Sequence, residues 1–202
     1  MHDIKTLARR GGVAALILLA ASAAQAHPGH DTHGLADGFA HPFSGLDHLL
    51  AMAAVGVWSA AALPAGRRLI GPLVFLALLL VGAALPRFGL VLPGLEAAVA
   101  VSVVALGALL VVARHPTVRL PLPAGLALVG IAAVMHGMAH GADVAPGQAF
   151  AGYAVGFMAA SALLHGAGLA LGGRLQRSRA WAWRTTAAFV GFSGLAMLAG
   201  RL

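Results

Sequence analysis

The sequence of 202 residues contains no cysteine, which excludes disulfide bonds, thiolate metal sites and cysteine nucleophiles. Charge is also scarce: Asp, Glu, Lys and Arg make up 9% of the chain, against about 25% in a soluble domain. A phosphate-binding loop of the form GxxxxGK[ST] is missing, so no ATP hydrolysis by that route is predicted. With 60% hydrophobic residues, the composition indicates an integral membrane protein.

Six apolar blocks fill the chain after its first 43 residues, each close to the ~20 residues of a membrane-spanning helix. We place them at about 44–63, 69–85, 91–113, 121–140, 149–171 and 185–200. They predict an all-α, polytopic bundle of about six transmembrane helices over 44–202. A Gly137-x-x-x-Gly141 pair indicates close helix packing.

The first 26 residues have the features of a cleaved signal peptide. A basic start with Lys5 and Arg9 precedes a short apolar run over 13–21 and the small-x-small sequence Ala-Gln-Ala at 24–26. An uncleaved first helix is the alternative. Cleavage leaves a periplasmic, histidine-rich segment over 27–43, in which His27 and His30 either gather a metal ion or belong to a hydrated tail.

The formal net charge is +7, and the arginines that contribute to it are divided unequally between the predicted loops. Because they are scattered between apolar blocks, they predict membrane topology and no nucleic-acid partner. Those on the predicted inner side are Arg67, Arg68, Arg114, Arg119, Arg174, Arg177, Arg179 and Arg184, whereas the outer side has Arg87 and Arg201. The bias predicts a bacterial inner-membrane protein whose mature N-terminus is periplasmic.

Polar side chains recur near the outer ends of the predicted spans. They are Asp47 and His48 in the first span, Glu96 in the third, His136 and His140 in the fourth, and Asp143 just after it. The two histidines at i and i+4 lie on one helix face. Imidazole and carboxylate ligands together suit Ni²⁺, Co²⁺, Zn²⁺ or Cu²⁺. A carboxylate beside a ligand histidine can also fix its tautomer, and Asp47 is placed to do this.

His165 is predicted much deeper, roughly 24 Å from the outer end of the fifth span. It is either a second ligand, a proton acceptor or a structural hydrogen-bonding residue. Structural interpretations also exist for the others: helix packing for His136 and His140, helix capping for Asp47, and solvation among lipid headgroups for Glu96. A shared depth favours a metal site, because separate structural roles would not place all these groups in one layer.

Two motifs resemble those of the HupE/UreJ family of hydrogenase and urease accessory membrane proteins, over essentially the whole mature chain. The signature His-x5-Asp-His is matched by His41, Asp47 and His48, and a signature close to FHGxAHGxE is matched from His136 to Gly141. Met135 replaces the Phe and Asp143 replaces the Glu, which leaves the metal preference open. The resemblance implies a nickel or cobalt permease.

The resulting hypothesis is a permease that carries a divalent ion from periplasm to cytoplasm, with Ni²⁺ first, Co²⁺ next and Zn²⁺ the weakest candidate. No prosthetic group and no enzymatic activity are expected. The alternatives are a zinc-dependent intramembrane hydrolase, drawing on Ser44 and the same ligands, and a metal-binding accessory subunit without transport. Oligomerisation and contact with nickel-enzyme maturation proteins are compatible with each of them.

Overall fold

The computed structural model describes residues 34–144 and 150–201, and within them the chain is helical. The signal peptide, His27 and His30 lie outside the described residues. The elements are α2 (Leu35–Ser44), α3 (Leu46–Ala62), η1 (Ala65–Arg67), α4 (Ile70–Ala84), η2 (Leu85–Phe88), α5 (Leu95–Ala113), α6 (Leu122–Asp143), α7 (Phe150–Arg177) and α8 (Ala180–Ala199). The predicted all-α fold class is therefore confirmed.

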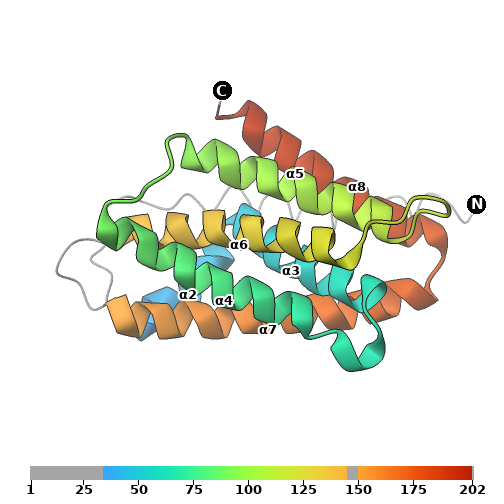
Figure 1. The fold of residues 1–202 in the computed structure, drawn as a ribbon, viewed down its shortest axis with the longest axis horizontal. Helices are drawn as coiled ribbons and strands as arrows, with labels where there is room; N and C mark the ends of the chain where they lie inside the picture. Colours follow the sequence, from blue (N-terminus) through green and yellow to red (C-terminus); the bar gives the residue numbers. More distant parts are fainter. Residues whose placement is uncertain (1–33, 145–149, 202) are drawn as a thin grey trace, which may run out of the picture.

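The long helices run roughly along one axis and form a bundle, with α5 and α8 on one side and α4 and α7 on the other (Figure 1). The most extensive helix pairs are α4 with α6, α3 with α7, α5 with α8 and α2 with α7. Helix α3 also packs against α4, α5 and α6. Its middle turns are almost entirely buried, so α3 provides the centre of the core.

Glycines determine how closely α6 approaches α4. A side chain at Gly137 would collide with the carbonyl oxygen of Leu79, and one at Gly141 would collide with that of Ala83. The two backbones are therefore in direct contact along this seam, as small-xxx-small pairs allow. Because His136 and His140 each precede one of these glycines, the seam also determines which way the two imidazoles face.

Helices α2 and α3 are bent by 84° at Gly45. Helix α2 packs on α7, where a side chain at Gly38 would meet the Tyr153 carbonyl and one at Gly156 would meet the Leu35 carbonyl. The sequence predicted a periplasmic, histidine-rich segment over 27–43, and its side of the membrane stays a prediction. Within the described residues, 35–43 belong to this packed helix, which brings His41 onto the bundle.

Four segments are long and apolar enough to cross a membrane: Ala65–Phe88, Leu95–Ala113, Leu122–Asp143 and Phe150–Arg177. The bent α2–α3 pair is a fifth if it counts as one span. Helix α8 does not meet this measure within the described residues, so the expectation of about six spans stays a prediction.

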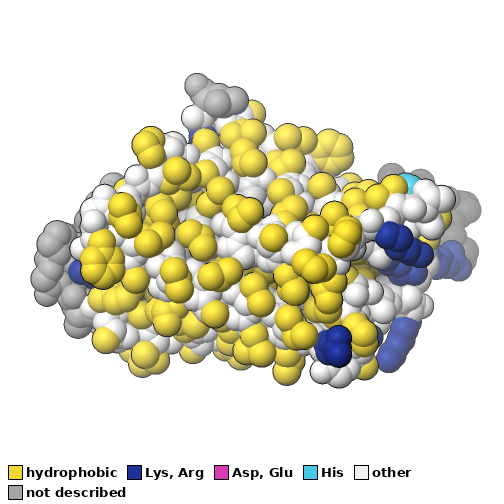
Figure 2. All heavy atoms as spheres, viewed as in Figure 1, with side chains coloured by type: hydrophobic (Ala, Val, Ile, Leu, Met, Phe, Trp, Pro, Cys, Tyr) yellow, Lys and Arg dark blue, Asp and Glu magenta, His cyan; other side chains and the backbone are white. Residues whose placement is uncertain are grey.

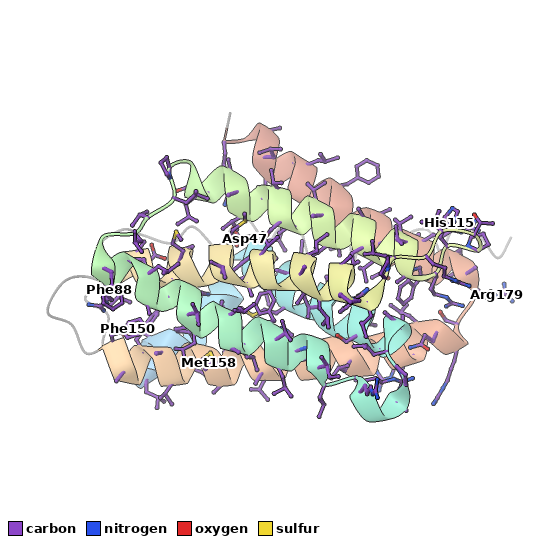
Figure 3. The ribbon with its side chains drawn as sticks, viewed as in Figure 1. Asp47, Phe88, His115, Phe150, Met158 and Arg179 are labelled. Atoms are coloured by element: carbon purple, nitrogen blue, oxygen red, sulfur yellow. The ribbon has the colours of Figure 1, made fainter. Side chains whose placement is uncertain are left out.

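The two ends of the bundle differ in charge. Figure 2 shows hydrophobic side chains over most of one face and the Lys and Arg side chains gathered mainly at one end of the long axis. Figure 3 places His115 and Arg179 at this end, and Phe88 and Phe150 at the opposite one. We refer to them as the arginine end and the opposite end.

Candidate metal-binding site

Four imidazoles from three helices converge inside the bundle: His41 of α2, His48 of α3, and His136 and His140 of α6. The ring centre of His140 is 4.4 Å from that of His48 and 4.8 Å from that of His41. The His48 and His136 rings are 5.0 Å apart. We call these residues the histidine cluster. His41 and His140 are 99 residues apart in the sequence, so only the fold brings the cluster together.

Asp47 fixes the tautomer of His48. Its Oδ1 atom lies 2.7 Å from His48 Nδ1 and also accepts the His48 backbone N–H at 2.9 Å. Because a carboxylate can only accept, Nδ1 carries the proton and Nε2 keeps its lone pair. His48 Nε2 is buried and has no hydrogen-bond partner among the described residues, so its lone pair is available to a metal ion.

Ser102 of α5 plays the same part for His136. Its hydroxyl donates to the Val99 carbonyl at 2.7 Å, so its oxygen can only accept from His136 Nε2, 3.0 Å away. The proton of His136 is therefore on Nε2, and Nδ1 keeps the lone pair. Within the described part of the chain, His136 Nδ1 is also buried without a partner.

His140 is fully buried, and its ring stacks on Phe157 at 4.8 Å between ring centres. Neither of its nitrogens has a partner in the described ranges 34–144 and 150–201. A buried polar atom without a hydrogen bond costs about 1–3 kcal/mol. Three neighbouring histidines of the described residues, His48, His136 and His140, therefore have nitrogens whose hydrogen-bonding capacity is unused.

The rings pack edge to face, and they do not yet surround a common point. Among the described residues, no group of three or more His, Asp or Glu side chains has the arrangement that holds a metal ion. Binding an ion would therefore require rotation of the imidazoles. The ligand roles predicted for these residues stay predictions.

An open pocket of about 1100 Å³ leads to the cluster. His41 and His48 line it, together with Asp47, Glu96 and Asp143. Asp143 is 59% exposed and lies 3.5 Å from His41 Nε2, whereas Glu96 is 84% exposed and does not reach the imidazoles. The predicted carboxylates are thus brought to the pocket, but only Asp47 is buried against the cluster.

His165 lies apart from the cluster. It follows Phe157 by eight residues of α7, or about 12 Å along the helix. Its Nδ1 donates to the Ser161 carbonyl at 2.6 Å, and its buried Nε2 has no partner in the described structure. The buried ring of Phe75 contacts both His165 and the histidine cluster. Its centre is 4.9 Å from the ring centre of His165 and 6.2 Å from that of His136.

Sequence reasoning missed four residues of this region: Phe75, Ser102, Tyr153 and Arg201. Ser102 is the one polar residue besides Glu96 in its predicted span, and Tyr153 is the only tyrosine of the chain, so both carried a weak signal. The Tyr153 ring lies 5.7 Å from that of His41. Phe75 had no signal, because it is one apolar residue among many.

Ser44, the serine considered for a hydrolase, lines the same pocket as His41 and His48. Its hydroxyl donates to the backbone carbonyl of His41 at 2.7 Å, within its own helix. The hydroxyl is therefore engaged in a local helix contact.

Comparison with known proteins gives one family. Residues 15–197 match the family described as HupE / UreJ protein. Protein HupE of Rhizobium leguminosarum bv. viciae is 38% identical over 180 residues, which cover 89% of this chain and 92% of the relative. No solved structure matches the chain. The family match includes the histidine cluster, Phe75 and His165, and it ends before Arg201.

Proposed function

The chain belongs to the HupE/UreJ family, and from this premise we propose that it is a permease for a divalent transition-metal ion, Ni²⁺ first and Co²⁺ second. The family and the apolar helices make it a multi-pass membrane protein. The metal is the transported substrate, and no resident cofactor is required. The observation that carries the proposal is the set of buried, unpartnered imidazole nitrogens within the described residues.

The donor types support a transition metal over a hard cation. Mg²⁺ and Ca²⁺ prefer oxygen ligands, whereas imidazole nitrogen suits Ni²⁺, Co²⁺ and Zn²⁺. His48 Nε2 and His136 Nδ1 are held in the tautomers that ligate, by Asp47 and Ser102 respectively. An ion that enters the pocket would lose water to these nitrogens.

A route inward is supported by the position of His165. Phe75 separates its free Nε2 from the cluster, so an ion would pass this ring before reaching the second imidazole. We propose that the opposite end faces the periplasm, because the arginine end then faces the cytoplasm. A doubly charged ion gains about 4.6 kcal/mol per 100 mV across an inside-negative membrane, enough to drive uptake without ATP.

Purified protein in liposomes tests the proposal directly. Uptake of Ni²⁺, Co²⁺ and Zn²⁺ is measured with and without an imposed inside-negative potential. We expect potential-dependent Ni²⁺ uptake that is lost in His48→Ala and His136→Ala and retained in His115→Ala, a histidine at the arginine end. Ni²⁺ binding without uptake by the wild type would instead identify a metal-binding accessory protein.

A further inference from the structure

Arg201, which follows α8, places a positive charge at the pocket. Its Nη2 atom lies 3.1 Å from Asp47 Oδ2, and its Nη1 donates to the Glu96 backbone carbonyl at 2.5 Å. Its Nε atom is 3.8 Å from Glu96 Oε2. One guanidinium therefore joins the first turns of α3 and α5 to the end of α8.

The two ion pairs differ in strength. Glu96 is 84% exposed, so its pair with Arg201 is weakened by water. Asp47 is 12% exposed, and its other oxygen is already occupied by His48. With Arg201 on Oδ2, both oxygens of Asp47 are engaged. A cation that coordinated Oδ2, the oxygen that His48 leaves open, would therefore lie beside the positive charge of the guanidinium or have to displace it.

We propose that Arg201 determines specificity at the entrance by occupying the carboxylate that a hard divalent cation would need. The inference rests on the proposed permease function, and it adds a residue that lies beyond the family match. Mg²⁺ and Ca²⁺ depend on carboxylate oxygens and gain little from imidazoles. A transition-metal ion can also bind the nitrogens of His48, His136 and His140, so Arg201 weakens its binding less than that of Mg²⁺ or Ca²⁺.

Binding of Mn²⁺, a hard cation visible by electron paramagnetic resonance, tests this without transport. We compare the wild type in detergent with Arg201→Gln, Arg201→Met and Arg201→Lys, and use Arg87→Gln as the matched control. Arg87 is another arginine of the opposite end, and it lies over the Phe150 ring, away from the cluster. Size-exclusion chromatography checks that each variant is folded, and the methionine keeps the aliphatic stem of the arginine.

We expect both neutral variants to bind Mn²⁺ about tenfold more tightly, the effect of removing a unit charge about 6 Å from a divalent ion in water. The lysine variant and Arg87→Gln should match the wild type. Mn²⁺ affinity that is unchanged in folded neutral variants would overturn the proposal. The proposal would also be overturned if Arg201→Lys bound Mn²⁺ as tightly as Arg201→Gln, because the positive charge would then not be the cause.

Uptake competition supplies the functional readout. In liposomes, Mg²⁺ and Ca²⁺ should inhibit Ni²⁺ uptake by Arg201→Gln at about tenfold lower concentration than in the wild type, with a smaller change in the KM for Ni²⁺. Equal inhibition of both proteins would overturn the specificity role. Wild-type liposomes that accumulate no transition metal would refute the permease function instead, and the Mn²⁺ comparison would still stand as a separate test.

Discussion

The histidines on the two sides of Phe75 differ in number and in surroundings. The cluster combines four imidazoles, and a pocket lined by three carboxylates leads to it. His165 is a single imidazole, held by the Ser161 carbonyl. The contrast suggests a division of roles: several ligands capture and dehydrate an ion, and a sparse site accepts it weakly enough to release it.

Removal of a cluster imidazole should have the largest effect on metal handling. His140→Ala deletes the ring that contacts both His41 and His48. We expect Ni²⁺ affinity and Ni²⁺ uptake to fall by about 100-fold or more, since a ligand is lost rather than reoriented. Calorimetry and liposome uptake measure the two quantities. Wild-type affinity in this variant would remove the cluster from the proposed route.

Asp47→Asn should have the next largest effect, because the variant keeps the shape of the side chain and loses its charge. Asn can present its amide N–H₂ to His48 Nδ1, so His48 is no longer held with its lone pair on Nε2. We expect Ni²⁺ affinity to fall by about 10- to 100-fold, as for other residues that orient a ligand. Glu96→Gln, at the exposed rim, is the comparison, and an equal loss there would argue for a purely electrostatic role.

His165→Ala should distinguish Ni²⁺ binding from Ni²⁺ transport. The residue lies beyond Phe75, so Ni²⁺ binding by the cluster should be unchanged while the rate of uptake falls by about tenfold, a barrier increase of about 1.4 kcal/mol. Binding by calorimetry and initial uptake rates in liposomes give the two values. If both fell together, the two sides of Phe75 would act as one site.

Glycine substitutions should have the smallest effect on metal binding and transport, and their effect on stability should depend on the space around each glycine. Gly141→Ala places a methyl group against the Ala83 carbonyl and should lower the unfolding free energy by about 1–3 kcal/mol, with a severalfold loss of Ni²⁺ affinity. Gly173→Ala meets nothing within 4 Å and should be neutral or slightly stabilising. Thermal unfolding in detergent distinguishes them. Equal destabilisation would contradict the close approach of α4 and α6.

Much of the fold and of the donor set could be predicted because both depend on local pattern. Long apolar blocks predicted the helices, and the spacing of His136 and His140 predicted a shared face. The packed helix α2 could not be predicted in this way, because a ten-residue segment with Asp37, His41 and Pro42 lacks the length and apolar character of a span. Its burial depends on α7, more than 100 residues away in the sequence.

The sequence by itself determined the helical class and the chemical types of the polar side chains, because composition and periodicity are properties of the chain read residue by residue. Tertiary structure decided which nitrogens keep free lone pairs, that Phe75 separates His165 from the cluster, and that Arg201 binds Asp47. Those features depend on the rotation and separation of helices distant in the chain. Backbone contacts at residues such as Gly137 and Gly141 set that geometry, and a one-dimensional pattern does not contain it.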